Sequence, residues 1–381
     1  MANRIFKMCM VLTSILPLFS CDKDEDKDVP LNWNTFLGYT PNLFGISVDG
    51  KVGFIDNTGK IVITPQFDFV GDFWFDLAVY GEYEEGNGGN KYGYFDKTGN
   101  KVIPANFHEA QNFGINKLAA VMNEDEEFGY INRSGELVIP YQYQYADLFN
   151  DGLAPVKKDG LYGYIDVTGK MVINPAYNYG SIFVNDIAYV RNNDYEYGYI
   201  DKTGDLIIGY KFDHAFYFID GLACVYKDGK FGYIKRDGSY AIEPTYDYAE
   251  TFWEGYAAVR IGEKYGFIDK TGEVKIEPQF DFAYGFSDGL AAVRQGESWG
   301  YIDKEGDFKI ETQYSYAEDF INGVAKVYFP GLEYGYINKN GEEIWRGTLH
   351  YIYQSAKRVQ QSDMNDLADK EMRYLKRALR K

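Results

Sequence analysis

The stretch Tyr265-Gly266-Phe267-Ile268-Asp269-Lys270-Thr271-Gly272 decides the fold of this chain. Its pattern of an aromatic residue, glycine, an aromatic residue, an aliphatic residue, aspartate, two polar residues and glycine recurs nine times along 381 residues. The first glycines of the nine copies are Gly53, Gly93, Gly129, Gly163, Gly198, Gly232, Gly266, Gly300 and Gly335. Successive copies are separated by 40, 36, 34, 35, 34, 34, 34 and 35 residues. Such even spacing indicates a tandem array of one structural unit rather than two or three ordinary domains.

The last glycine of the pattern marks a turn. It is kept in all nine copies, as expected where the backbone angle φ is positive. The position that opens the turn is Asp or Asn in every copy except Lys235. A side chain of that type accepts a hydrogen bond from a backbone N–H two residues further on. Together the two positions predict a hairpin whose connection is a type I turn followed by a glycine bulge.

The remainder of the unit adds strands and a core ring. The strand of Val274–Ile276 alternates apolar and polar residues and meets Pro278, which ends a strand or lies at a sheet edge. Phe286 recurs in every complete copy and is predicted to be core. In Leu290–Val293 the Ala and Val positions are expected to face the core, and the position between them is less constrained. Each unit of about 34 residues is therefore predicted to hold three antiparallel strands and a connecting loop.

This unit resembles the WG-repeat family. The resemblance covers residues 43–345 and is carried by the aromatic-Gly-[Tyr/Phe] start, the glycine turn, the Pro-x-[Phe/Tyr] step and the Gly-Leu-Ala-x-Val strand. Only Trp299-Gly300 shows the literal dipeptide, and Tyr, Phe or Val takes the tryptophan position in the other copies. The family implies an architecture much more than an activity, because a fold alone does not fix a function.

Two partial units stand at the ends of the array. Residues 44–51 resemble the last strand of a unit, and Tyr334–Trp345 resembles only its first hairpin. These halves are able to complete each other and close a ring. Nine units, however, exceed the four to eight blades usual for propellers, and three strands are one fewer than a standard blade has. We therefore expect an all-β open superhelix, with a closed propeller-like ring as the alternative.

The N-terminus, residues 1–20, is predicted to be a signal peptide. Arg4 and Lys7 precede an apolar run from Met8 to Phe19 that is too short for a membrane-spanning helix. The run ends in a sequence that resembles the lipobox of bacterial lipoproteins. The resemblance implies that Cys21 is lipidated, becomes the first residue of the mature chain and makes the membrane a partner.

An acidic tether and lead-in, residues 21–42, is expected to follow. The charged run Asp22–Asp28 cannot bury apolar surface and should be solvated. It resembles the export tag that Bacteroidetes lipoproteins carry after the lipidated cysteine, which implies an outer-membrane lipoprotein exposed at the cell surface. The alternative is a plain spacer on a protein that faces the periplasm.

Few residues single themselves out as a site. Trp74 and Trp253 share the position after the recurrent phenylalanine, where other copies place Gly, Asn, Val, Ile or Ser. We expect both side chains to be exposed and to bind a ligand, as stacking platforms for a sugar or peptide. His108, His214 and His350 occupy unrelated positions. No catalytic residue, metal site or cofactor is predicted, since no nucleophile, zinc or nucleotide motif is present.

The C-terminal tail, residues 346–381, differs in composition from the array. Apolar residues at helical spacing predict an α-helix over residues 362–380. The tail carries nine Lys or Arg and four Asp or Glu, a balance of +5 on a chain of net charge −18. The helix is predicted to cap the last unit of the array, because repeat arrays need such caps. A helix that binds a membrane surface or a partner is the alternative.

Charge and motif content limit the function. A net charge of −18 with no basic stripe on the array argues against binding of nucleic acid. No polar constellation is unique among the repeated positions, which favours a monomeric, non-catalytic binding or scaffold module for a protein or glycan. The alternatives are an enzyme whose site lies in a concave face or channel, and a purely structural envelope protein.

Overall fold

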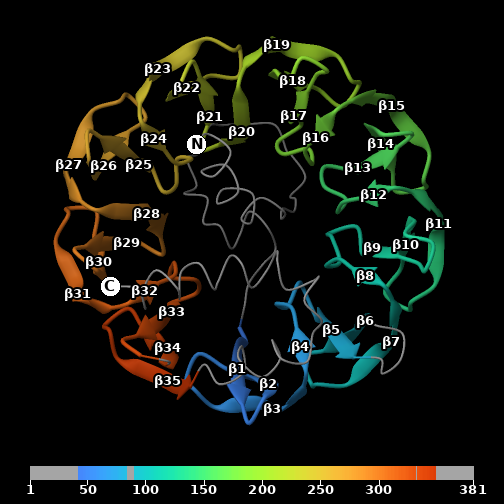
Figure 1. Cartoon of the computed structure of the whole chain (residues 1–381), viewed down its shortest axis with the longest axis horizontal. Helices are drawn as coiled ribbons and strands as arrows, with labels where there is room; N and C mark the ends of the chain where they lie inside the picture. Colours follow the sequence, from blue (N-terminus) through green and yellow to red (C-terminus); the bar gives the residue numbers. More distant parts are fainter. Residues whose placement is uncertain (1–41, 84–89, 332, 349–381) are drawn as a thin grey trace, which may run out of the picture.

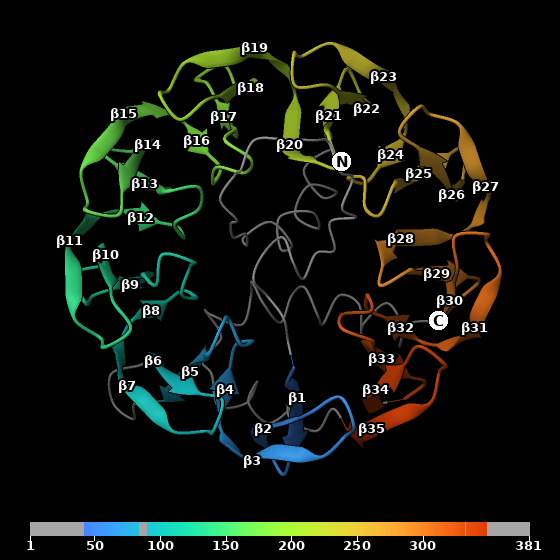
Figure 2. The ribbon, with the colours of Figure 1, turned by 180° about the vertical axis from the view of Figure 1, so that it is seen from behind.

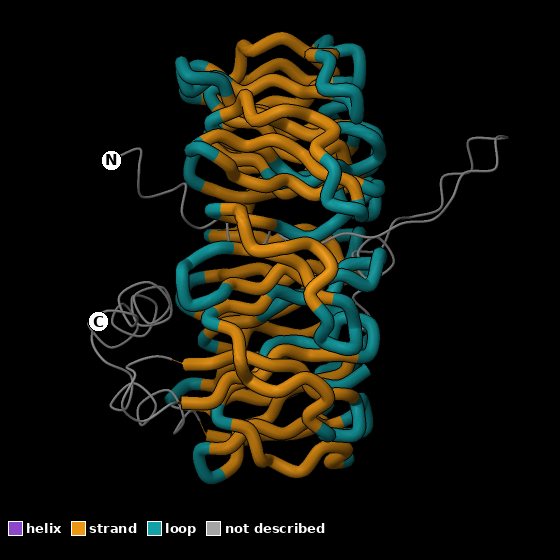
Figure 3. Tube along the Cα trace, turned by 90° about the vertical axis from the view of Figure 1, so that its right-hand side faces the viewer, coloured by secondary structure: helices purple, strands orange, loops and turns teal. Residues whose placement is uncertain are grey.

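The computed structural model describes residues 42–83, 90–331 and 333–348. Within these residues the chain forms nine antiparallel sheets that stand as blades around a central opening (Figures 1 and 2). Seen edge-on, the molecule is a flat ring whose strands cross its thickness and whose turns lie on both faces (Figure 3). In the described part of the chain, no helix has the length and hydropathy that a membrane crossing requires.

Eight blades have four strands, and the first blade in the described residues has three. The inner strands, nearest the central opening, are β4 (Phe69–Val70), β8 (Glu109–Ala110), β12 (Tyr145–Ala146), β16 (Tyr179–Gly180), β20 (His214–Ile219), β24 (Tyr248–Ala249), β28 (Phe282–Ser287) and β32 (Tyr316–Ala317). The second strands are β1 (Phe44–Val48), β5 (Leu77–Tyr83), β9 (Ala119–Met122), β13 (Leu153–Lys158), β17 (Ala188–Arg191), β21 (Leu222–Lys227), β25 (Tyr256–Ile261), β29 (Leu290–Gln295) and β33 (Val324–Phe329).

The third and outer strands form the hairpin that the repeated pattern encodes. The third strands are β2 (Lys51–Ile55), β6 (Asn90–Asp96), β10 (Phe128–Ile131), β14 (Leu161–Asp166), β18 (Tyr197–Ile200), β22 (Lys230–Ile234), β26 (Lys264–Asp269), β30 (Ser298–Ile302) and β34 (Glu333–Asn338). The outer strands are β3 (Ile61–Phe67), β7 (Lys101–Phe107), β11 (Leu137–Tyr143), β15 (Met171–Tyr177), β19 (Leu206–Phe212), β23 (Tyr240–Tyr246), β27 (Val274–Phe280), β31 (Phe308–Tyr314) and β35 (Glu343–Thr348).

The turn between the third and outer strands has the predicted geometry. In the seventh blade, the N–H of Gly272 donates to the carbonyl of Asp269 at 2.9 Å, and the N–H of Asp269 donates to Glu273 at 2.9 Å. The Asp269 carboxylate also accepts the N–H of Thr271 at 2.9 Å. Gly272 has a φ of +87°. The type I turn with a glycine bulge is confirmed, and the positive φ explains why this glycine never varies.

The first glycine of the pattern is fixed by a close approach of two strands. A Cβ atom at Gly266 would lie 2.5 Å from the carbonyl oxygen of Ile276 and 2.7 Å from the nitrogen of Pro278. The equivalent distance to the outer strand is 2.4 to 2.7 Å in all nine copies. Pro278 does not end its strand but lies within β27 at the outer edge of the sheet, where its missing N–H costs no ladder bond.

The first blade has the three strands predicted for each unit, but the other eight blades have four, because their connecting loop contains an additional, inner strand. In six blades this strand has only two residues, as in β24. Two residues show no alternation of apolar and polar side chains, so the pattern gave no indication of a strand.

Both faces of each blade are buried, because each sheet is packed between two neighbours. Phe286 is 1% exposed, as predicted for core. Ala291, Ala292 and Val293 are 0%, 1% and 0% exposed. The middle position, expected to be less constrained, is therefore as buried as the flanking ones. Neighbouring blades contact it as closely as they contact the other face.

Two contacts join successive blades. The hydroxyl of Tyr301 donates to the carbonyl of Glu318 in the next blade at 2.7 Å. The turn glycine Gly306 faces Ile276 of the preceding blade, whose methyl carbon would lie 3.2 Å from a Cβ atom at that glycine. The glycine contact recurs around the ring, and the hydroxyl contact recurs wherever the third strand carries tyrosine at the position of Tyr301.

The same contacts close the ring between the ninth and first blades. The Tyr336 hydroxyl donates to the carbonyl of Gly45 at 2.7 Å. A Cβ atom at Gly59 would lie 2.3 Å from the carbonyl oxygen of Ile344. The expected open superhelix was therefore wrong, and the alternative of a closed propeller-like ring is correct. Nine repeats of one angular step complete a full circle here.

Closure does not join the two partial units in one sheet. Residues 44–51 contribute β1 of the first blade, and Tyr334–Trp345 lies in β34 and β35 of the ninth. The two blades meet through side chains: the N–H of Ser47 donates to the Tyr334 hydroxyl at 2.8 Å, and Phe44 packs against Tyr336 with ring centroids 5.4 Å apart.

The array extends slightly further than predicted, because β35 continues to Thr348. The last unit is covered by the first blade, which supplies the contact that a cap was expected to provide. The predicted helix over residues 362–380 lies outside the described residues. The signal peptide of residues 1–20 and nearly all of the tether also lie outside them.

Candidate functional site

A belt of packed aromatic rings is formed by the first residues of inner strands and by residues at the start of third strands. We call it the aromatic belt. Its inner-strand members are Phe69, Tyr145, Tyr179, His214, Tyr248, Phe282 and Tyr316, and its third-strand members are Tyr92, Phe128, Tyr162, Tyr197, Phe231, Tyr265, Trp299 and Tyr334. Where successive members meet, ring centroids lie 4.8 to 6.4 Å apart, a distance typical of packed aromatic pairs.

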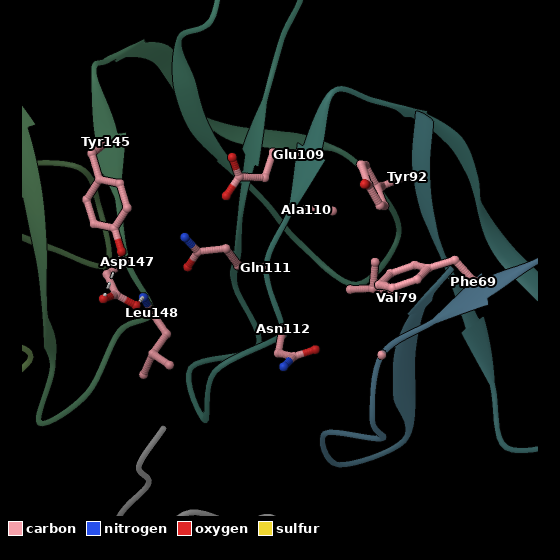
Figure 4. A pocket seen from close by; sticks show the side chains of 11 residues that line it. Phe69, Val79, Tyr92, Glu109, Ala110, Gln111, Asn112, Tyr145, Asp147 and Leu148 are labelled. Atoms are coloured by element: carbon pink, nitrogen blue, oxygen red, sulfur yellow. Dashed lines mark hydrogen bonds between the residues drawn. The ribbon is translucent and has the colours of Figure 1, made fainter. Parts of the chain in front are cut away.

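The aromatic belt is interrupted in the third blade, where β8 begins with Glu109 instead of a ring. A recess of about 410 Å³ opens at this place (Figure 4). We call it the belt recess. It is lined by Phe69, Gly71, Val79, Tyr92, Glu109, Ala110, Gln111, Asn112, Tyr145, Asp147 and Leu148. The missing ring explains the cavity, because the other inner strands place an aromatic side chain at the same position.

Hydrogen bonds fix the polar groups of the belt recess across two blades. The Gln111 amide donates to the carbonyl of Ala146 at 2.9 Å. Asp147 accepts the N–H of Leu148 at 2.7 Å and the hydroxyl of Tyr145 at 3.3 Å. Figure 4 shows the Gln111 side chain pointing toward Asp147 from the neighbouring inner strand. These bonds hold the recess in one geometry, as a binding site requires.

The belt recess also holds unpaired negative charge. Burial raises the pKa of Asp147, although the hydrogen bonds from Leu148 and Tyr145 act in the opposite direction. Burial likewise raises the pKa of Glu109, whose carboxylate is partly desolvated although the residue is solvent-accessible. Across the described residues, neither carboxylate has an ion-pair partner.

Carboxylates between outer and inner strands elsewhere in the ring are paired with lysine. The pairs are Lys51 with Asp68 at 2.7 Å, Lys230 with Asp247 at 2.6 Å and Lys264 with Asp281 at 2.6 Å. The belt recess therefore differs from these surface carboxylates in lacking a counterion.

Two more carboxyl groups have raised pKa values: Glu250 follows β24 in the seventh blade, and Asp319 follows β32 in the ninth, whereas the belt recess lies between the second and fourth blades (Figure 1). Burial raises the pKa of Glu250 to about 7, against hydrogen bonds from the Tyr248 hydroxyl and the Gly285 N–H. Burial and the nearby Glu250 and Glu318 carboxylates raise the pKa of Asp319 to about 7.

The expected exposure of Trp74 and Trp253 was wrong. Their side chains are 2% and 6% exposed, and they belong to an apolar cluster with Leu148, Ile182, Val184 and Ile219. Neither lines the belt recess. Their shared position lies between an inner and a second strand, where side chains of several blades pack together. The ligand-binding role proposed for the two tryptophans has no support from exposure.

The histidines in the described chain do not converge, because His108 lies in the third blade and His214 in the sixth. The imidazole of His108 is 3.9 Å from the Glu124 carboxylate at an exposed surface. His214 stacks on Tyr197 with centroids 4.8 Å apart. Burial and the Arg191 charge lower the pKa of His214 to about 4. His350 and the predicted lipidation residue Cys21 lie outside the described residues.

Other reactive groups form no site within the part of the chain that the structure covers. Cys224 is the one cysteine there, and it is buried. No group of three or more His, Cys, Asp or Glu side chains in residues 42–83, 90–331 and 333–348 is arranged to hold a metal ion.

Sequence reasoning missed the belt recess, although the sequence contained an indication of it. Comparing the copies at the inner-strand position gives an aromatic residue in seven of eight blades and glutamate in one. The indication is weak in the sequence, because an inner strand of two residues such as β8 has no alternating pattern that would distinguish it from a loop.

Comparison with known proteins identifies the repeat. A family model described as "WG containing repeat" matches residues 53–76, 92–126, 128–162, 162–195, 197–231, 231–265, 265–298 and 299–329. No curated protein matches the chain. A crystal structure of a eukaryotic initiation factor has 11% identity and a TM-score of 0.58, over 81% of this chain and 96% of that one. BamB from Moraxella catarrhalis has 9% identity and a TM-score of 0.39, over 79% and 95%. The first of these likenesses supports the fold alone.

Proposed function

We propose that this chain, which belongs to the family of WG-containing repeat proteins, is a non-catalytic scaffold that holds a partner on the inner wall of its ring. The observation that carries the proposal is the belt recess. The unit repeats around the whole ring, and a surface made of equal units offers no single point of recognition. A cavity at the break of the aromatic belt in the third blade is where selectivity is expected.

The chemistry of the belt recess suits a protein or glycan partner. Rings of Phe69, Tyr92 and Tyr145 offer flat apolar faces, and Glu109 and Asp147 offer hydrogen-bond acceptors beside them. Sugar rings and peptide side chains both use this combination of stacking and directional bonds. Closure of the ring supports a monomer, because both terminal blades already contact each other.

The location of the scaffold is proposed from the sequence. A lipid on Cys21 would anchor the chain, and the acidic run Asp22–Asp28 would serve as a tether and export tag. We accordingly place the protein among Bacteroidetes-like lipoproteins of the outer membrane, with the ring at the cell surface. A ring facing the periplasm is the alternative.

Metabolic labelling tests the anchor. Cells that express the wild-type chain or Cys21→Ala are grown with a palmitate analogue, and label should enter only the wild type. Protease treatment of intact cells then distinguishes the faces, because a surface-exposed ring is digested without lysis. Equal labelling of both chains would remove the lipid anchor from the proposal.

Site-specific photo-crosslinking tests the scaffold. A photo-reactive phenylalanine replaces Phe69, which already places a ring in the belt recess, or, as a matched control, Tyr248 at the equivalent position of the seventh blade. We expect a discrete adduct in living cells only from position 69. No adduct from either position, or identical adducts from both, contradicts binding at the recess and favours a purely structural envelope protein.

A further inference from the structure

The belt recess combines two charged acceptors with no positive charge of its own. Its eleven lining residues include Glu109 and Asp147 but no lysine, arginine or histidine. Removing carboxylates from bulk water is costly unless an opposite charge or good hydrogen bonds compensate. Asp147 receives two hydrogen bonds, whereas the Glu109 carboxylate receives none from the described residues. A ligand that brings positive charge would compensate both groups.

The aromatic lining favours the same ligand. Phe69 is 42% exposed and stands at one side of the belt recess, and Tyr145 stands at the other (Figure 4). The face of an aromatic ring carries a negative quadrupole and attracts ammonium groups within about 6 Å of its centre. Rings next to carboxylates therefore select an organic cation over an anion, and over a neutral group of the same size.

We infer that the belt recess binds an alkylammonium group, carried either by a lysine side chain or by an amino sugar of the partner. This inference rests on the proposed scaffold function and names the class of ligand that it holds. A volume of about 410 Å³ lies within the usual range for a small-ligand site and admits the cation with its carbon frame. The net charge of −18 also draws cations toward the ring.

Calorimetry with paired probes tests the inference on the full-length chain. A glucosamine tetramer is compared with its N-acetylated form, and a lysine-containing tripeptide is compared with its Nε-acetyl-lysine form. Each pair differs in charge at one kind of group. The probe that binds identifies the source of the ammonium group, as sugar or as peptide.

Three variants define the site. Glu109→Gln keeps the shape of the side chain and removes its charge. It should weaken binding of the cationic probe about tenfold. Glu109→Tyr supplies the missing ring of the aromatic belt and should abolish binding by filling the recess. Glu250→Gln is the matched control, because Glu250 holds in the seventh blade the position that Asp147 holds in the fourth, and binding should stay within about twofold. Thermal melting confirms that each variant is folded.

The outcomes separate the two proposals. Preference for a cationic probe that is lost in Glu109→Gln and kept in Glu250→Gln supports the inference. Equal binding of the charged and acetylated probes overturns it. Absence of binding to all probes also overturns it, and the crosslink at position 69 then decides whether the scaffold proposal survives without it.

Discussion

Single residues that depart from the repeat provide titratable groups where other copies have an apolar ring. Glu109 is the first such residue, and His214 is the second. It occupies a position of the aromatic belt that Phe282 fills two blades later. Its imidazole stacks on Tyr197, and its pKa lies near 4 because burial and Arg191 disfavour the charged form. The unfolded chain, with a histidine pKa near 6.5, binds a proton more readily than the folded ring.

We predict that His214→Phe makes the ring more resistant to acid. The stability due to neutral His214 is complete above pH 6.5 and is lost as the pH falls toward 4, by roughly 2 to 3 kcal/mol. Urea denaturation at pH 7.5 and pH 4.5 measures it. The wild type should lose more free energy of unfolding between these pH values than the variant, with the exposed His108→Phe as control. Equal losses in wild type and His214→Phe would show that this histidine does not sense acid.

At the scale of the elements, a hydrogen bond from a third strand orients the next blade wherever that strand carries tyrosine at the position of Tyr233. The donors are tyrosine hydroxyls and the acceptors are carbonyls that follow the inner strands. The pairs are Tyr94 with Gln111, Tyr130 with Asp147, Tyr164 with Ser181, Tyr199 with Phe216, Tyr233 with Glu250 and Tyr301 with Glu318. Phe54 and Phe267 take this position in the first and seventh blades and have no hydroxyl.

We predict that Tyr233→Phe destabilises the ring by about 1 kcal/mol, because the carbonyl of Glu250 loses a donor in a buried place. The bond is 2.6 Å long and Tyr233 is 0% exposed. The reverse change, Phe267→Tyr, should add a donor facing the carbonyl of Tyr284. Tyr195→Phe, at a side chain that is 68% exposed, is the control and should be neutral within error. A loss no larger than that of Tyr195→Phe would disprove the role of the bond.

For the whole molecule, the decisive contact is the one between the last blade and the first. Gly59 and Gly272 occupy the same turn position with φ of +85° and +87°. A Cβ atom at Gly272 would have Ile242 as its nearest neighbour at 3.6 Å, whereas one at Gly59 would lie 2.3 Å from a backbone oxygen of Ile344. Substituting each glycine by alanine therefore distinguishes the cost of a positive φ in the turn, present at both positions, from the cost of disturbing ring closure, present only at Gly59.

We predict that Gly59→Ala opens the ring, whereas Gly272→Ala only weakens it. The second variant carries the cost of a left-handed backbone alone, about 1 kcal/mol, and the first adds a clash with backbone that cannot turn away. Hydrogen exchange should show lost protection in β1 and β35 for Gly59→Ala. Matching exchange patterns in the two variants would mean that closure does not depend on this contact.

The sequence by itself determined the repeat, the hairpin and the core ring. The turn at Asp269–Gly272 was predictable because φ preference and the aspartate hydrogen bond act within a few consecutive residues. Phe286 was predictable as core because its position recurs in every copy. The invariance of Gly266 was visible, but its cause, the crossing of the outer strand at 2.5 Å, was not.

Only the tertiary structure decided the shape and the candidate site. Closure depends on the sum of nine small rotations between blades, and no local stretch encodes that sum. The inner strands form because the second strand of each blade pairs with them. A segment of two residues has no sequence pattern that would predict this pairing. Trp74 and Trp253 are buried by other blades, so their position in the unit says nothing of their exposure. Likewise, the belt recess exists at Glu109 only because Tyr92 and Tyr145 of the neighbouring blades line it as well. A cavity is formed by residues that are distant in sequence, so one position cannot reveal it.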